Sequence, residues 1–123
     1  MTYLKLNDIT AYKTAFGLSN YIWECISKWN YFEQDTVGKQ LVRACDSISA
    51  NIAEGFGRYG KRDKVKFYYY AKGSVWEALD WNEKCKKRAL ITEEQYQHIL
   101  GELQELPKAI NSLIKFTNER LQH

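Results

Sequence analysis

The residues of this chain most suited to chemistry form a polar row between positions 40 and 58. The row reads Gln40, Arg43, Ser47, Asn51, Glu54 and Arg58. On an α-helix, spacings of three and four residues place all six side chains within about 80° of arc. Such a stripe of charges and amides could bind a ligand, contact phosphate or form a structural hydrogen-bonded network.

Catalysis finds little support in the rest of the sequence. The two histidines, His98 and His123, have no carboxylate cluster, phosphate loop or nucleophile elbow to accompany them. Glu54 and Glu77 could form a carboxylate pair, but a di-iron bundle also needs Glu-x-x-His on two helices. We therefore expect a protein that is not an enzyme, with no catalytic residue, no metal and no cofactor.

Four helices are predicted to position the polar stripe. Apolar residues recur every three or four positions over about 8–29, 37–56, 62–88 and 93–121. Short connections favour antiparallel neighbours, so we expect an all-α, up-down-up-down four-helix bundle formed by one domain, residues 1–123. On the first helix, Phe16 and Trp23 are expected to widen the buried face. The inward face of the third is expected to be Phe67, Ala71, Ser74, Ala78, Trp81 and Cys85.

Local signals predict where these helices begin. Asn7 or Asp8 is a suitable N-cap for the first helix, and Asp35 or Thr36 for the second. Thr92 followed by Gln95 has the pattern of a capping box, so the fourth helix is expected to open at Glu93.

Glycine and proline mark two further features. Gly55, Gly57 and Gly60 predict a turn within about 57–61 that uses positive φ. They are no dinucleotide fingerprint, because no strand precedes them. Pro107 removes a backbone donor and is expected to bend the fourth helix without splitting it, since the apolar stripe keeps its phase across it.

Cysteine usage and hydropathy favour a cytoplasmic protein. Cys25, Cys45 and Cys85 are odd in number and far apart, so we expect core thiols in a reducing compartment. The first ten residues lack a charged start followed by an apolar run, and no stretch of about 18 apolar residues occurs. Neither a signal peptide nor a membrane span is therefore predicted.

The stretch from Gln40 to Glu77 resembles a family of small four-helix-bundle proteins encoded in intervening sequences of bacterial large-subunit ribosomal RNA genes. The family pattern is Q-L-x-R-A-x-x-S-I-x-x-N-I-A-E-G-x-G-R, then F-x-x-x-A-x-G-S-x-x-E. The matching positions are Gln40, Leu41, Arg43, Ala44, Ser47, Ile48, Asn51, Ile52, Ala53, Glu54, Gly55, Gly57, Arg58, Phe67, Ala71, Gly73, Ser74 and Glu77. Cys45 stands where the family often has alanine.

The resemblance implies a ring-like homo-oligomer, with a pentamer as the expected form. The family is distantly similar to accessory proteins of diversity-generating retroelements, which partner a reverse transcriptase and bind nucleic acid. The resemblance brings no established biochemical activity, and it does not make this chain a structural component of the ribosome.

The polar stripe has two interpretations. In the structural one, Arg43 pairs with Glu54 or Glu77 across the bundle, and Asn51 bonds Ser47 or Ser74, so that no polar group is buried alone. The network would comprise Gln40, Arg43, Ser47, Asn51, Glu54, Arg58, Ser74 and Glu77. In the alternative, the stripe faces a neighbouring subunit or a channel and contacts phosphate.

Aromatic residues on the third helix point to self-association. Tyr69, Gly73 and Trp76 lie roughly opposite its predicted inward face. Aromatic residues make up 15% of the chain, more than one small helical core can easily enclose. We expect these three residues to lie at an interface between copies of the chain.

Two basic runs permit a different function. One contains Arg58, Lys61, Arg62, Lys64 and Lys66, and the other Lys84, Lys86, Lys87 and Arg88. About 35 to 40 Å of helix separates them, and repeated around a ring each run would form a positive rim suited to phosphate backbones. The net charge of +3 permits RNA or DNA binding without requiring it.

The leading hypothesis is a non-enzymatic assembly or scaffold protein. The alternative is a nucleic-acid-binding accessory factor, with a protein partner such as a reverse transcriptase.

Overall fold

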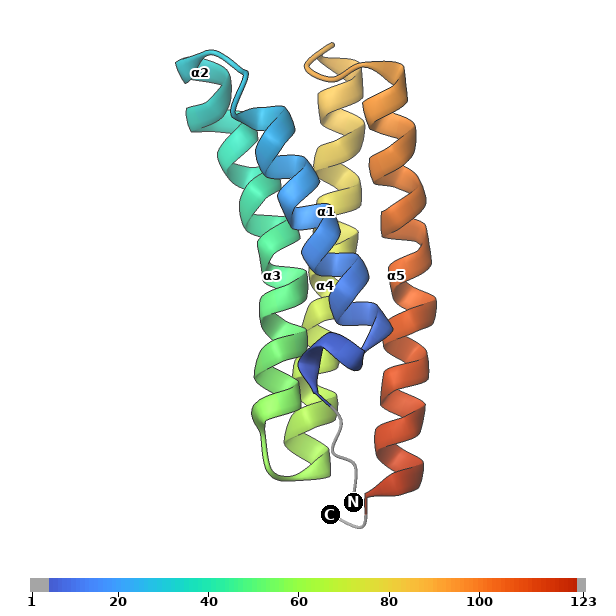
Figure 1. Ribbon diagram of the computed structural model, residues 1–123. Helices are drawn as coiled ribbons and strands as arrows, with labels where there is room; N and C mark the ends of the chain where they lie inside the picture. The colour runs from blue at the N-terminus through green and yellow to red at the C-terminus, as the bar shows by residue number, and fades with distance from the viewer. Residues whose placement is uncertain (1–4, 122–123) are drawn as a thin grey trace.

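Helices account for all of the regular structure in the computed structural model, which describes residues 5–121 (Figure 1). The four long helices are α1 (Thr10–Ile26), α3 (Lys39–Gly57), α4 (Lys61–Lys87) and α5 (Glu93–Arg120). A 3-10 turn (Leu6–Asp8) precedes α1, and a short helix α2 (Tyr31–Glu33) leads through a π-helical turn (Gln34–Gly38) into α3. The long helices alternate in direction, which confirms the predicted up-down-up-down bundle.

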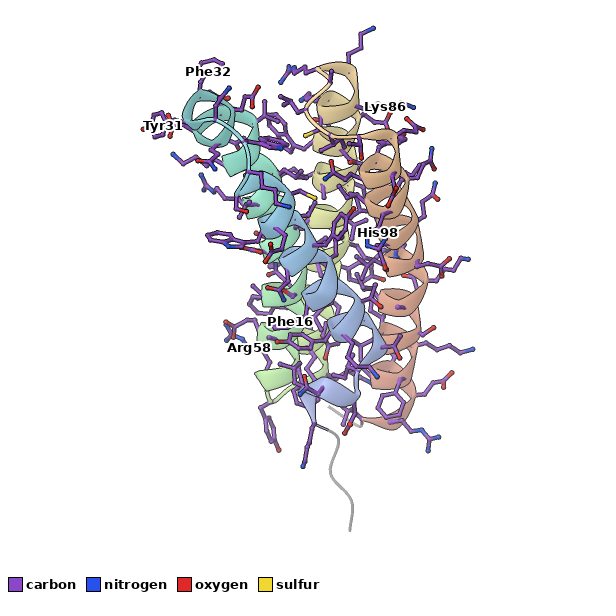
Figure 2. All side chains as sticks on the ribbon, turned by 45° about the horizontal axis from the view of Figure 1, so that its top comes forward. Phe16, Tyr31, Phe32, Arg58, Lys86 and His98 are labelled. Carbon is purple, nitrogen blue, oxygen red and sulfur yellow. The ribbon has the colours of Figure 1, made fainter. Side chains whose placement is uncertain are left out.

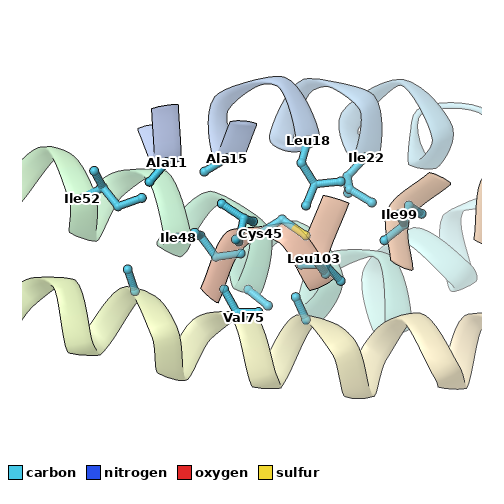
Figure 3. Close-up of a cluster of buried hydrophobic side chains, with 14 of the residues drawn as sticks. Ala11, Ala15, Leu18, Ile22, Cys45, Ile48, Ile52, Val75, Ile99 and Leu103 are labelled. Atoms are coloured by element: carbon cyan, nitrogen blue, oxygen red, sulfur yellow. The ribbon is translucent and has the colours of Figure 1, made fainter. Parts of the chain in front are cut away.

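The packing order places α1 and α4 at diagonal corners of the bundle. The packed pairs are α1 with α3, α3 with α4, α4 with α5, and α5 with α1. Apolar side chains from all four helices fill the space between them (Figure 3). They include Leu18, Ile22, Ile48, Ile52, Val75, Ile99 and Leu103. Removing this apolar surface from water is the main force that holds the four helices together.

The buried faces differ from the predicted ones on two helices. Trp23 and Phe16 do not widen the buried face of α1, since 63% and 53% of their surfaces are exposed. On α4 the buried face is displaced to one side of the prediction. Ala71, Ala78 and Cys85 are buried as expected, but Tyr68, Val75 and Asn82 are buried in place of the half-buried Phe67, Ser74 and Trp81. An apolar stripe with aromatic residues on its flank does not specify which flank the neighbouring helix covers.

Asn82 is a fully buried polar residue that the displaced face brings into the core. Its side-chain nitrogen donates to the Tyr96 carbonyl oxygen over 3.4 Å, and its Oδ1 has no donor within residues 5–121. Leaving such an oxygen unpaired costs about 1–3 kcal/mol. The three cysteines are buried and unpaired, as the sequence predicted.

The first two predicted helices begin without the predicted caps. The Asp8 carboxylate accepts from the Lys5 backbone N–H within the 3-10 turn, and α1 starts after Ile9 without a side-chain cap. Asn30 caps the next helical segment by accepting from the Glu33 N–H at 2.9 Å. The predicted caps Asp35 and Thr36 instead lie inside the π-helical turn.

The turn between α3 and α4 does not use positive φ. Arg58 and Gly60 are extended, with φ of −75° and −85°, and none of the described glycines has a positive φ. Ala89, just after α4, is the described residue that does, at 56°. The glycine that matters here is Gly55. A Cβ at this position would lie 2.7 Å from the Tyr68 ring.

The fourth predicted helix begins where expected. The Gln95 N–H donates to the Thr92 hydroxyl at 3.0 Å, and the Thr92 N–H to the Gln95 side chain at 2.9 Å. This confirms the capping box. Helix α5 also continues through Pro107 as one helix.

Candidate self-assembly surfaces

The polar stripe lies on the surface of the single chain. Gln40, Ser47 and Asn51 are half-buried, whereas Arg43, Glu54 and Arg58 are exposed. On α4, Ser74 is half-buried and Glu77 is exposed. The Arg58 guanidinium lies 4.6 Å from the centroid of the Phe67 ring. This contact links the end of α3 to helix α4.

The contacts within the stripe are local rather than across the bundle. Glu54 pairs with Arg58 at 3.1 Å, and the Asn51 amide donates to the Ser47 backbone oxygen at 2.8 Å. The predicted ion pair of Arg43 with Glu54 or Glu77 does not form within residues 5–121. Partners one helical turn apart are already neighbours, so Glu54 reaches Arg58 without crossing to another helix.

The outward face of α4 carries the aromatic residues expected at an interface. Tyr69 and Trp76 are 55% and 69% exposed, and Gly73 between them is also exposed. Asp80, four residues after Trp76, and Glu83, three residues after Asp80, continue this face. We call Tyr69, Trp76, Asp80 and Glu83 the aromatic ridge. Whether another subunit covers it remains a prediction.

A groove between α1 and the start of α3 was missed by the sequence analysis. Its volume is about 510 Å³, and it is lined by Trp23, Ile26, Ser27, Gln34, Gly38, Lys39, Val42 and Arg43. We call it the Trp23 groove. The signal was the helical position of Trp23, which lies about 140° around α1 from the buried Leu18.

The π-helical turn forms one wall of this groove. The Gln34 side chain donates to the Ile26 backbone oxygen at 2.9 Å, which ties the turn to the end of α1. A Cβ at Gly38 would lie 2.8 Å from Ile26 Cγ2, so glycine permits this close packing. These contacts within the chain fix the position of the π-helical turn beside α1.

Two basic side chains lie beside the apolar part of the groove. Lys39 is 3.9 Å from Asp35, and Arg43 makes no ion pair within the described residues. They are one helical turn apart on α3 and therefore share a side of the groove. The groove thus combines an apolar surface with positive charge.

The two basic runs lie at opposite ends of α4, where Figure 2 shows Arg58 and Lys86. Several of their charges are already engaged. Lys66 lies 3.8 Å from Asp63, Lys84 lies 2.6 Å from Asp80, and the Lys86 ammonium lies 4.2 Å from the Tyr96 ring centroid. Lys61, Arg62, Lys87 and Arg88 have no carboxylate partner within residues 5–121.

Lys64 does not belong to a phosphate-binding rim. Its ammonium donates to the backbone oxygens of Phe56 at 2.6 Å and Gly55 at 3.5 Å, at the end of α3. Burial lowers the pKa of Lys64 from its usual value. Its side chain thus satisfies carbonyl groups that α3 leaves unpaired, which distinguishes it from the other cations of this run.

The thiols and the histidine offer no assembled reaction centre within residues 5–121. Burial raises the pKa of Cys45 to about 12 and that of Cys85 to about 11, so both thiols stay protonated at neutral pH. His98 packs 4.2 Å from the Tyr21 ring and lies 3.9 Å from Glu102. Across the described residues, no three His, Cys, Asp or Glu side chains gather where they could hold a metal ion.

None of the described helices is both long enough and apolar enough to span a membrane.

Comparisons with known proteins identify the fold and the family. A crystal structure from Bacteroides thetaiotaomicron, of a protein with unknown function from the S23 ribosomal protein family, superposes with a TM-score of 0.76. The two sequences are 24% identical, and the match covers 86% of this chain and 99% of the other. No curated protein sequence matches the chain. The description "23S rRNA-intervening sequence protein" is that of a family whose sequence pattern matches residues 7–112. The chain belongs to this family of 23S rRNA-intervening sequence proteins.

Proposed function

We propose that the protein is a non-enzymatic scaffold that assembles into a homo-oligomer. The observation that carries this proposal is the exposure of Trp76 and Trp23, at 69% and 63%, on two separate surfaces. Large exposed aromatic residues are typical of the anchors that protein interfaces bury. A ring of five copies is the form that the family resemblance implies.

The polar stripe fits the same proposal. Its amides and hydroxyls are half-buried in one chain, and a neighbouring subunit would complete their burial while supplying partners. Its exposed charges, Arg43 and Glu54, would then help to fix how subunits are aligned. The unpaired cysteines agree with a reducing compartment, which we propose is the cytoplasm.

The mass of the protein in solution tests this function. Native mass spectrometry and sedimentation should give a multiple of the 14.5 kDa chain, with five copies as the expected number. Trp76→Glu should yield a monomer. Its helical circular dichroism spectrum should stay unchanged, because Trp76 is exposed on α4 and is not part of the core. Tyr59→Glu is the matched control, since Tyr59 is 91% exposed on the α3–α4 turn and belongs to neither surface. A wild-type chain that stays monomeric at micromolar concentration would refute the scaffold proposal.

A second candidate function is nucleic-acid binding at the turn between α3 and α4. Tyr59 stands between Arg58 and the unpaired cations Lys61 and Arg62. An exposed ring beside cations is the combination that stacks bases and contacts phosphates in single-stranded nucleic acid. The protein would then act as an accessory factor, together with a partner such as a reverse transcriptase.

Salt dependence tests this second candidate. Fluorescence anisotropy with a single-stranded RNA should show affinity that falls as salt rises, with a log–log slope of about −0.7 per phosphate contact. Lys61→Ala with Arg62→Ala should reduce the slope, and Tyr59→Ala should weaken binding with little change of slope. Absence of binding at low salt would remove the candidate.

A further inference from the structure

We propose that the aromatic ridge of one copy docks into the Trp23 groove of the next. In this contact Trp76 enters the groove, and Asp80 and Glu83 face Lys39 and Arg43 of the neighbouring copy. The inference rests on the proposed self-assembly and specifies which two surfaces perform it.

The groove has the size and the surface for a large aromatic side chain. Its volume of about 510 Å³ lies in the range of pockets that hold small organic molecules. Ile26, Val42 and the Trp23 ring supply apolar surface, and Gly38 allows the π-helical wall to pack closely on Ile26. An indole ring placed there would lose water and stack beside Trp23.

The charges of the two surfaces are complementary. Lys39 and Arg43 lie one turn apart on α3, and Asp80 and Glu83 lie about one turn apart on α4. Arg43 makes no ion pair within its own chain's described residues.

Each carboxylate of the ridge also retains a vacant oxygen. Lys84 binds Oδ2 of Asp80, and the Tyr96 hydroxyl donates to Oε2 of Glu83. Within residues 5–121, Oδ1 of Asp80 and Oε1 of Glu83 have no donor. These oxygens can accept from basic groups of a second copy without breaking the contacts inside the chain.

The position of the two surfaces makes the contact head-to-tail. The groove lies between α1 and α3, whereas the ridge lies on α4, which is diagonal to α1 in the bundle (Figure 1). A chain therefore cannot fill its own groove. Two different patches that bind each other generate a closed ring or an open filament rather than a symmetric dimer.

A mixing experiment separates this arrangement from the alternatives. Trp23→Glu disables the groove and Trp76→Glu disables the ridge, and both residues are exposed enough for the bundle to fold. Each variant alone should be monomeric. An equimolar mixture should form a 1:1 heterodimer, because one intact groove meets one intact ridge. Native mass spectrometry resolves the mixed species from either parent after isotopic labelling of one variant.

The other outcomes overturn the inference in distinguishable ways. If the wild type assembles and either variant keeps the wild-type mass, the interface lies elsewhere and the scaffold function survives. If both variants are monomeric and their mixture also stays monomeric, one chain must supply both tryptophans to the same contact, and docking of ridge into groove is wrong. A monomeric wild type would overturn both proposals.

Charge exchange provides a second measurement of the same contact. Arg43→Glu and Asp80→Arg should each weaken assembly at least tenfold, since each places like charges together across the contact. The double variant should recover most of that loss by restoring opposite charges. Lys108→Glu is the control, because Lys108 lies on α5 outside both surfaces and should leave the mass unchanged. A double variant that assembles no better than the singles would contradict the pairing.

Discussion

Gly55 lies where helix α3 packs closely against helix α4. A Cβ built there would lie 2.7 and 2.9 Å from two carbons of the Tyr68 ring and 3.0 Å from the Lys64 backbone oxygen. Tyr68 is fully buried and cannot move aside without disturbing the core. The glycine is therefore needed for space, not for an unusual backbone angle.

Replacing Gly55 by alanine should destabilise the bundle by about 1–2 kcal/mol. Overpacking a core typically costs about 1–3 kcal/mol, and alanine recovers about 0.5–1 kcal/mol of helix propensity. Gly101→Ala on α5 is the matched control, because nothing lies within 4 Å of its Cβ position. It should stabilise the protein by about 0.5–1 kcal/mol. Urea unfolding measures both, and equal effects at the two positions would contradict the packing argument.

Residue types alone could not separate exposed from buried aromatic side chains. Trp23 and Phe16 lie near the edge of the apolar stripe of α1, where either burial or exposure fits the spacing. The angle at which α1 packs on α3 decides the outcome, and that angle depends on every core contact. The same uncertainty hid the Trp23 groove and displaced the expected buried face of α4.

Helices were easier to predict from the sequence than their ends. Long apolar periods identified four long helices correctly, because each period spans several turns. The second predicted helix was expected to begin near Val37, but helical structure already begins at Tyr31 and runs through the π-helical turn into α3. The π-helical turn accommodates an extra residue, which interrupts the 3.6-residue period ahead of Val37. Asn30 and Asp35 have equally suitable cap chemistry, so local signals could not choose between them.

The polar stripe shows the same limit at the level of the helix. Its spacing correctly placed Gln40, Arg43, Ser47, Asn51 and Glu54 on one side of α3, apart from the core, and Arg58 follows as the C-cap residue. Spacing does not say what lies opposite that side. Asn51 bonds Ser47, one of its two expected partners, whereas Glu54 pairs with Arg58 rather than with Arg43.

Across the whole molecule, alkaline stability should reflect the buried thiols and phenols. Burial raises the pKa of Cys45 from 9.0 to about 12, of Cys85 to about 11, and of Tyr68 from 10.0 to about 12. In the unfolded chain these groups ionise near their ordinary values. The folded state therefore binds more protons between about pH 9 and 12, and the free energy of unfolding falls as pH rises through this window.

The urea midpoint should accordingly be constant from pH 7 to 8 and decline from pH 9 to 11, measured with a reductant present. Each group that stays protonated only in the folded state contributes up to about 1.4 kcal/mol per pH unit. The lowered pKa of Lys64 acts in the opposite direction, but a single lysine cannot cancel three buried acids. Cys45→Ala removes one of the three groups and should give a shallower decline of the urea midpoint with pH. The slopes are compared rather than the midpoints, because the substitution also alters packing and so changes stability at every pH. A midpoint that does not change between pH 8 and 11, or a Cys45→Ala slope as steep as the wild type, would show that these side chains ionise without unfolding.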